Sequence, residues 1–414
     1  MKTKLNLLIP TLSLLFFGAY SVHATLPVVS NISATQRDSA KLVDITYDVA
    51  DADGDLLKIR IEVSDNAGAQ YSIPAFSLTG DIGDDVTPGT GKAIVWDAGV
   101  DWDGEYSDQM RVKVIAVDAR GFPGLEWGNE VPAGGFLMGQ DGGTEGSGPS
   151  LHVNIPWSYW LSKYEITIEQ YCEFLNTALV AGEVYRNGTT SVLASDSAFI
   201  GVPSGSLLLN IGDAYDVAWN VNNFEVVVGQ DDRPVGVTWY GAIAFAQHYG
   251  YDLPTRAEWE KAARGPDHDD QDEHQLYPWG DTITAGHGNF NNNGDPFESS
   301  SNAKTPVGYY DGNQTPLGPD TANAHGLYDL IGNAGEWTRT INTAVESYSQ
   351  EEDLNAGHNS LTSSTSRYYK EGWRSWNYIN YYFEVENKIY FWRSQSPASY
   401  IPQVGFRVIR RSLP

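Results

Sequence analysis

The stretch DLIGNAGEWTRT, residues 329–340, surrounds a glycine-rich turn with two acidic side chains, Asp329 and Glu336. The Gly-Asn-Ala-Gly segment between them can adopt backbone angles closed to most residues, because glycine has no Cβ atom. Such a turn can direct carbonyl oxygens inward, and Ca²⁺ takes about six to eight oxygen ligands from carboxylates, carbonyls and water. The pattern is therefore compatible with a calcium site. In the alternative interpretation, Asp329 caps a turn and Glu336 pairs with Arg339 or another base.

The first 24 residues have the organisation of a secretory signal peptide. Lys2 and Lys4 precede an apolar run that closes on SVHA, so cleavage is expected between Ala24 and Thr25. The run is short for a transmembrane helix and contains Pro10. We therefore expect an exported protein without a membrane span, which is secreted, periplasmic or held at the cell surface.

The composition is that of a folded, strongly acidic protein. The 414 residues carry a formal net charge of -27, and 41% of them are hydrophobic, which suffices for the cores of two or three domains. So negative a surface repels phosphate backbones and excludes nucleic acid as a partner, whereas it attracts cations. The only cysteine is Cys172, so the chain forms no internal disulfide.

Residues 25–118 predict an all-β sandwich of the immunoglobulin or fibronectin-III type, followed by a linker over residues 119–130. VDITYDVA and LKIRIEVS alternate apolar and polar residues, and KAIVWDA and MRVKVIAVD supply further strands. Between the first two lies DADGD, for which we favour a hairpin turn. A calcium loop of Asp51, Asp53 and Asp55 is the alternative, but no glutamate follows where an EF-hand requires one.

Helical periodicity appears in the second part of the chain. TIEQYCEFLNTAL places Cys172 on an apolar face behind Thr167 as the N-cap, so Cys172 is expected in the core. TWYGAIAFAQHYG predicts a second helix. In PTRAEWEKAARG, a third, Thr255 and Glu258 have the spacing of a capping box.

Six segments in this order resemble the formylglycine-generating enzyme, or sulfatase-modifying factor, family: GGFLMG, YEITIEQYCEFLN, RPVGVTWYGAIAFAQHYGYDLPTRAEWEKAARG, YPWGD, GLYDLIGNAGEWTRT and GFRVIRR. The resemblance implies that residues 131–414 form an α+β domain of the C-type-lectin-like variant fold, with little regular secondary structure. It also implies a structural Ca²⁺ in the opening stretch. Carried over by position, Asp329 and Glu336 would supply carboxylate oxygens, and Gly332 and Ala334 backbone carbonyls.

A second calcium position of the family uses an asparagine side chain and the next carbonyl. By resemblance, GNFNNNGD offers Asn289 and Phe290 for it. Its acidic partner does not align, and Asp295 and Glu298 are both candidates.

The oxidases of this family work through two cysteines that bind copper, and thiolates are soft ligands suited to Cu(I). The corresponding stretch here, residues 370–397, contains no cysteine, and Cys172 lies far upstream. We therefore assign no catalytic residue and expect no copper.

The same stretch is rich in aromatic residues. Aromatic side chains with polar tips are good anchors for peptides and glycans, although this fold also packs its core with them, and about half are expected there. The predicted binding groove consists of Arg374, Trp376, Tyr378, Tyr381 and Arg393.

Two functions remain open from the sequence. The first is an exported, calcium-stabilised module that binds an extracellular peptide, protein or glycan. The alternative is a divergent metal-dependent oxidase of the formylglycine-generating and non-heme iron enzyme superfamily, acting on proteins through ligands other than cysteine. Calcium alone in the purified protein would favour binding, whereas copper or iron would favour oxidation.

Overall fold

The computed structural model describes residues 27–37, 40–51, 56–68, 73, 75–118, 121–139, 150–196, 198–199, 201–212, 216–265, 275–290, 293–297, 304–342, 366–370 and 392–412. The predicted signal peptide lies outside these ranges, as do four of the five predicted groove residues.

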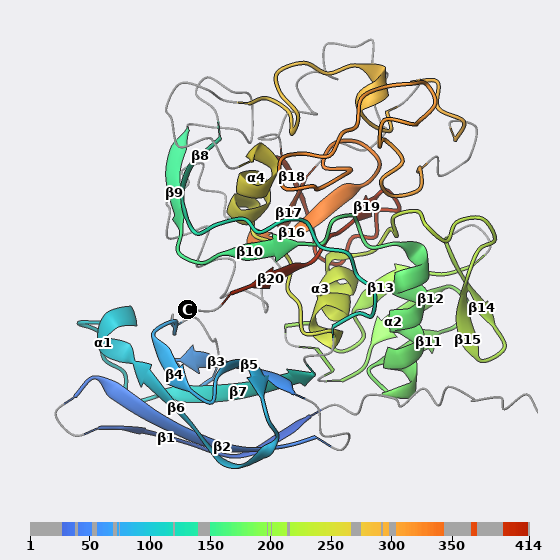
Figure 1. The fold of residues 1–414 in the computed structure, drawn as a ribbon. Helices are drawn as coiled ribbons and strands as arrows, with labels where there is room; N and C mark the ends of the chain where they lie inside the picture. The colour runs from blue at the N-terminus through green and yellow to red at the C-terminus, as the bar shows by residue number, and fades with distance from the viewer. Residues whose placement is uncertain are drawn as a thin grey trace, which may run out of the picture.

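The N-terminal body consists of strands packed in two antiparallel sheets (Figure 1). Its elements are β1 (Val28–Gln36), β2 (Leu42–Ala50), β3 (Leu57–Ser64), β4 (Leu78–Gly80), β5 (Gly83–Val86), β6 (Gly89–Asp97), α1 (Ala98–Asp101) and β7 (Arg111–Asp118). One sheet has the order β1-β2-β6-β4 and the other the order β5-β3-β7, and both contribute to one hydrophobic core. A β-sandwich is therefore present, and its immunoglobulin-like assignment stays a prediction.

The hairpin predicted at DADGD is wrong. Strand β2 pairs with β1 and β6, whereas β3 pairs with β5 and β7, so the connection crosses from one sheet to the other. Ile45 of β2 and Ile59 of β3 are fully buried in the same core from opposite sides of the sandwich. Alternation of apolar residues predicts which face of a strand is buried, but it does not predict which strand lies beside it.

The larger body combines short strands with a few helices and long irregular segments. Its elements are β8 (Gly134–Met138), β9 (Leu151–Ile155), β10 (Tyr159–Leu161), α2 (Ile168–Val180), β11 (Val184–Asn187), β12 (Ser191–Ala194), β13 (Leu207–Asn210), β14 (Val217–Asn220), β15 (Asn223–Val226), α3 (Trp239–His248), α4 (Arg256–Arg264), the 3₁₀ turn η1 (Ala285–His287), β16 (Gly335–Ile341), β17 (Arg367–Lys370), β18 (Trp392–Gln395), β19 (Val404–Gly405) and β20 (Ile409–Arg411).

Local capping chemistry fixes where these helices begin. Thr167 and Gln170 exchange side-chain hydrogen bonds with each other's backbone N–H at the start of α2, and Thr255 and Glu258 do the same at α4. Both predicted N-caps are confirmed. Thr238 caps α3 through the N–H of Gly241. Each cap satisfies backbone donors that the first helical turn leaves free.

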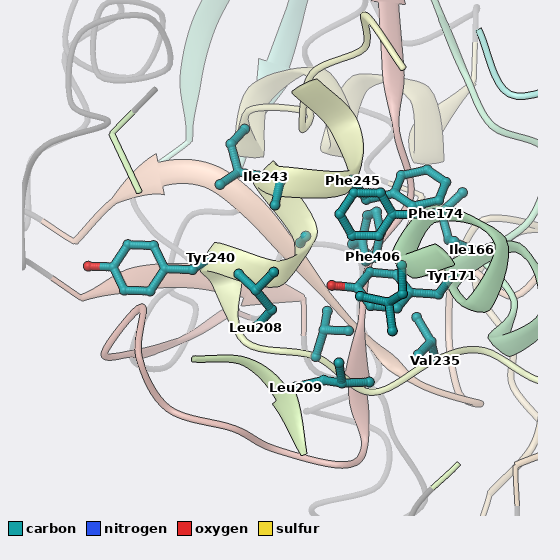
Figure 2. Close-up of a cluster of buried hydrophobic side chains, with 14 of the residues drawn as sticks. Ile166, Tyr171, Phe174, Leu208, Leu209, Val235, Tyr240, Ile243, Phe245 and Phe406 are labelled. Atoms are coloured by element: carbon teal, nitrogen blue, oxygen red, sulfur yellow. The ribbon is translucent and has the colours of Figure 1, made fainter. Parts of the chain in front are cut away.

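An aromatic core lies between α2 and α3 (Figure 2). Tyr171 of α2 stacks on Phe245 of α3 with ring centroids 5.9 Å apart, while Phe174 and Phe406 meet Phe245 edge-on at 5.5 and 5.3 Å. Cys172 is 5% exposed in the same core, which confirms its predicted place. Phe406 belongs to the C-terminal segment, so this core joins the helices to the end of the chain.

The C-terminal segment pairs with two strands of the larger body, and one of them, β16, follows the glycine-rich turn directly. Strand β16 lies inside the sheet β18-β17-β16-β19, antiparallel to β17 and parallel to β19. Strand β20 pairs with β10, about 250 residues earlier. Among the helices that the structure describes, none is long and apolar enough to cross a membrane.

Candidate functional site

The turn that precedes β16 holds three residues in the left-handed backbone region. The φ angles are 54° at Asp329, 88° at Gly332 and 56° at Asn333. This region is uncommon for residues other than glycine, although Asp and Asn enter it more readily than most. Such a backbone persists only where the surrounding contacts determine it, so the contacts of Asn333 explain the turn.

The buried side chain of Asn333 connects three segments. Its Oδ1 accepts the backbone N–H of Thr305 at 2.9 Å and the side-chain amide of Asn289 at 3.3 Å. Its Nδ2 donates to Oε2 of Glu165 at 3.1 Å. Through Asn333, the two segments predicted as separate calcium positions lie against each other. A Cβ atom at Gly332 would stand 3.0 Å from backbone atoms of Asn289, so glycine is needed there.

Glu336 lies 1% exposed at the start of β16 in a two-pronged ion pair. Arg407 donates from Nε to Oε2 and from Nη2 to Oε1, both at 2.7 Å, and Trp259 Nε1 donates to Oε2 at 2.6 Å. The alternative interpretation, in which Glu336 pairs with Arg339 or another base, is confirmed for another base, Arg407, whereas the Arg339 guanidinium pairs with Asp252. Among the described residues, Oε1 of Glu336 accepts one hydrogen bond, from Arg407, and a carboxylate oxygen has a second lone pair for a further partner.

Three buried carboxylates share this region with one guanidinium. Asp329 accepts the N–H of Gly308 at 2.5 Å, and burial raises the pKa of Asp329 to about 6. Burial also raises the pKa of Glu165 well above its usual range, and the negative charges of Asp329 and Glu336 add to that effect. Arg407 balances only one of the three carboxylates, so when all are ionised the region attracts a cation.

One buried oxygen here, the Thr305 hydroxyl, has no hydrogen-bond partner within the part of the chain that the structure describes. Side chains alone do not form a metal site, because no group of three or more His, Cys, Asp or Glu residues among the described ones could hold an ion. The donor set fits a hard cation that accepts carbonyls, with Asp329, Gly332 and Ala334 as ligands and Glu336 through one oxygen.

The structure describes only one of the two acidic candidates for the second calcium position. Asp295 is buried, accepting the hydroxyl of Tyr310 at 3.2 Å and the N–H of Phe297 at 2.7 Å. Phe290 is 1% exposed and packs with Ile331 rather than at the surface. Glu298 lies outside the described residues.

Of the predicted groove, the structure describes only Arg393. It is exposed on β18, the outer strand of its sheet. Arg374, Trp376, Tyr378 and Tyr381 lie outside the described residues. Two aromatic residues near the predicted groove in the sequence, Tyr369 and Trp392, are core residues at 7% and 3% exposure.

Three polar side chains form a row between α2 and α3: the hydroxyl of Thr177, the imidazole of His248 and the carboxylate of Glu183. The sequence analysis did not connect them. His248 meets Thr177 Oγ1 at 3.0 Å through Nε2 and Glu183 Oε2 at 2.6 Å through Nδ1. The Thr177 hydroxyl also donates to the carbonyl of Phe174 at 2.9 Å, within its own helix. An activated nucleophile would be free of that bond, so the row is a polar connection between the helices.

Sequence reasoning missed Glu165, Asn333 and Arg407 as members of the site. Arg407 lies between the apolar residues Phe406 and Val408, so a charged side chain interrupts an apolar run. Glu165 likewise lies between Tyr164 and Ile166. A charge within an apolar run signals a buried ion pair or hydrogen-bond network, although its partner far along the chain is not visible in the pattern.

Comparison with known proteins identifies the class to which this architecture belongs. Residues 129–412 match the model of the sulfatase-modifying factor enzyme 1-like domain, so the chain belongs to that family. The predicted fold class is confirmed at this level, as a mostly β domain with few helices.

Individual relatives are a little over a quarter identical to the chain over the aligned residues. A formylglycine-generating enzyme of Mus musculus is 28% identical over 239 residues, 52% of this chain and 59% of that protein. An inactive C-alpha-formylglycine-generating enzyme 2 of Bos taurus is 28% identical over 252 residues, 54% of this chain and 75% of that protein. The chain thus spans less than two-thirds of the mouse relative.

Solved structures align over a larger share of the chain. Treponema denticola variable protein 1 aligns with a TM-score of 0.42 at 17% identity, covering 69% of this chain and 95% of that one. PvdO from Pseudomonas aeruginosa aligns with a TM-score of 0.40 at 18% identity, covering 68% and 93%.

Proposed function

We propose that this family member is an exported, calcium-stabilised module that binds an extracellular peptide, protein or glycan and lacks the copper oxidase chemistry. The observation that carries the proposal is the burial of the only thiol in the chain, because a buried thiol is a poor copper ligand. Cys172 is buried in the helical core, and burial raises its pKa to about 12, which disfavours the thiolate that Cu(I) requires. The similarity to an inactive formylglycine-generating enzyme 2 supports the same conclusion.

Calcium in this proposal neutralises the carboxylate cluster and connects its segments. Asp329 would offer a carboxylate oxygen, Gly332 and Ala334 their carbonyls, and Glu336 its less occupied oxygen. The support is the Thr305 hydroxyl, which is buried without a hydrogen-bond partner among the described residues, together with the three buried carboxylates beside Arg407. Asn289 and Phe290 adjoin this cluster, so a second ion there would share its electrostatic field.

The first expected result concerns chelation. Calcium at a hundredfold excess over its Kd adds about 2.7 kcal/mol to the free energy of unfolding, because it binds only the native state. A chelator should therefore lower the Tm of the wild type but hardly change that of Asp329→Ala. Glu336→Ala is less suited, because it also breaks the pair with Arg407.

Thermal melts with and without chelator provide the measurement. Asp108→Ala is the matched control, since it removes the same charge from an exposed position on the N-terminal body and should respond as the wild type does. Equal sensitivity of wild type and Asp329→Ala to the chelator would exclude this site.

The second expected result concerns catalysis. A sulfatase-type cysteine peptide incubated with the protein, oxygen and copper should not become formylglycine, because tryptophan, tyrosine and asparagine cannot replace a thiolate pair on Cu(I). Mass spectrometry reports conversion as loss of sulfur and gain of oxygen.

An active formylglycine-generating enzyme serves as the positive control in this assay. Conversion by the wild type that persists in Cys172→Ser would contradict the proposal and favour the oxidase with other metal ligands. In that case, copper or iron should also be found in stoichiometric amount in the purified protein.

The binding surface is proposed at the predicted aromatic groove, with Arg393 on the outer strand β18 at its described border. An exposed outer strand presents backbone donors and acceptors to an extended peptide. Arginine adds a charge that selects acidic groups on a peptide or glycan. Export through the signal peptide would bring this surface to extracellular ligands.

A further inference from the structure

We infer that a strip of four aromatic side chains on the larger body binds a lysine- or arginine-rich segment of a partner protein. The aromatic strip consists of Tyr328, Tyr164, Tyr309 and Phe297, in this order, and all four side chains are partly exposed. None of the four belongs to the predicted groove. The inference depends neither on that groove nor on calcium.

Short contacts join the four rings. The centroids of Tyr328 and Tyr164 lie 5.5 Å apart, and those of Tyr309 and Phe297 lie 5.2 Å apart. Gly308 connects the two pairs: a Cβ atom there would stand 2.5 Å from Cε1 of Tyr164, so the ring of Tyr164 lies directly against the backbone beside Tyr309. Segments that are distant in the sequence thus form one aromatic surface.

The chain's own cations show how this surface accepts a positive charge. Nζ of Lys163 lies 5.0 Å from the ring centroid of Tyr164 and 5.8 Å from that of Tyr328. At the other end of the strip, the guanidinium of Arg233 lies 5.3 Å from the ring centroid of Phe297. A cation within about 6 Å of an aromatic ring is attracted by the negative face of the ring. Both ends of the aromatic strip therefore already hold a cation in the free protein.

Carboxylates border the same surface. Four exposed acidic residues lie next to the strip or to one of its two cations: Glu126, Asp231, Asp232 and Asp320. Four negative charges against the two positive ones leave an excess of two negative charges among these residues. The surface is therefore complementary to further positive charge, and the net charge of -27 on the whole chain attracts such a partner from a distance.

Contacts hold these carboxylates near the rings. Glu126 pairs with Lys163 at 3.1 Å, and Asp320 hydrogen-bonds with the hydroxyl of the first tyrosine of the strip. The carbonyl of Asp232 accepts the N–H of Val307 at 2.8 Å, which fixes that backbone beside the middle of the strip. A lysine or arginine that packs on a ring can thus reach a carboxylate with its charged end.

The rings are held in place before a partner binds. The hydroxyl of Tyr309 accepts the N–H of Thr315 at 3.0 Å, and Gly308 has a φ angle of 71°, in the left-handed region that favours glycine. A surface that is ordered in advance loses less conformational entropy on binding.

A basic protein segment matches both the rings and the carboxylates, whereas a neutral glycan matches only the rings. Lysine and arginine carry an apolar stem that packs along an aromatic ring and a charged end that pairs with a carboxylate. A neutral sugar stacks on the ring but brings no charge to the acidic border. The phosphates of a nucleic acid would be repelled by that border.

The test is fluorescence anisotropy of two labelled peptides of equal length, titrated with the full chain. One peptide alternates lysine with serine, and the other alternates glutamate with serine. The wild type should bind the lysine peptide and not the glutamate peptide. Tyr309→Leu should raise the Kd for the lysine peptide about two- to fivefold, the effect of one exposed cation–π contact.

Tyr106→Leu is the matched control for this change. Tyr106 is 86% exposed on the N-terminal body, so the substitution also removes an accessible ring without changing the charge. Its Kd should equal that of the wild type.

Lys163→Gln should have the opposite effect and bind the lysine peptide about two- to fivefold more tightly. The substitution frees the rings of Tyr164 and Tyr328 and leaves Glu126 without its counter-ion. A change that only loosened the fold would weaken binding instead. Lys113→Gln is the control, because Lys113 pairs with Glu62 on the N-terminal body at 3.9 Å.

A pair of charge variants is available if Tyr309→Leu does not fold. Asp232→Asn and Asp108→Asn remove the same charge from two exposed positions, the first beside Arg233 and the second on the N-terminal body. Only Asp232→Asn should weaken binding of the lysine peptide. Equal weakening by both would show that net charge alone attracts the peptide and would overturn the inference.

The remaining outcomes are equally decisive. The inference is overturned by an unchanged Kd in folded Tyr309→Leu, by a wild type that does not bind the lysine peptide, or by tighter binding of the neutral oligosaccharide maltohexaose. Weaker binding in Tyr309→Leu together with tighter binding in Lys163→Gln supports it. The chelator and mass-spectrometry assays test the proposed function separately, so either can fail without the other.

Discussion

Arg407→Met should lose about 3–5 kcal/mol of the free energy of unfolding, the effect expected when one partner of a buried ion pair is removed. Methionine matches the length of arginine but leaves Glu336 without its counter-ion. The variant also loses the hydrogen bonds from Arg407 to the carbonyls of Ser162 at 3.0 Å and Tyr328 at 2.9 Å. Urea unfolding followed by tryptophan fluorescence measures the loss.

Arg410→Met is the matched control for this change. Arg410 is exposed and lies over the rings of Trp127 and Trp160 at 4.6 and 5.0 Å, a contact worth about 0.5–1 kcal/mol at such sites. Calcium should stabilise Arg407→Met more than the wild type, since the buried cluster then lacks its only guanidinium. Similar losses in the two arginine variants would show that the ion pair is not a main support of the domain.

Trp392→Ala and Trp376→Ala should have opposite effects. Trp392 is 3% exposed and meets Trp259 edge-on with centroids 5.4 Å apart, so its truncation should cost about 3–5 kcal/mol of stability. Trp376 is predicted in the groove, where truncation should leave the Tm nearly unchanged and abolish retention on an immobilised peptide or glycan that holds the wild type.

The Tm of the Trp376→Ala variant and its retention on the immobilised ligand together show whether Trp376 lies in the core or in a binding groove. A strongly destabilised Trp376→Ala variant would place this residue in the core and remove the main support for a binding groove. An unchanged Tm with unchanged retention would instead move the ligand to another surface. Trp392→Ala calibrates the assay, because its core position is known.

Local signals predicted the regular elements well. Thr167 and Thr255 were identifiable as N-caps because capping chemistry acts over three residues. The strands around Ile45 and Ile59 were identifiable because alternation marks a half-buried strand. The ordered set of family segments likewise predicted the domain that the comparison confirms.

Distant partners were not predictable in the same way. The pair of Glu336 with Arg407 and the bonds of Glu165 to the turn join residues 71 and 168 or more positions apart, and a local pattern carries no information about such distances. The false hairpin between β2 and β3 has the same origin. The sequence therefore suggested the candidate ligands, which stay a prediction, but it did not identify the residues that contact them.

The pairing of β10 with β20 has a consequence for how the protein is made. Residues 159–161 cannot find their partners until residues 409–411 have been synthesised, and ribosomes add about 5–20 residues per second, so the wait is roughly 10 to 50 s. The strands of the N-terminal sandwich are complete by residue 118 and can pair long before that. The larger domain can therefore complete this sheet only after the sandwich has formed, once residues 409–411 have been synthesised.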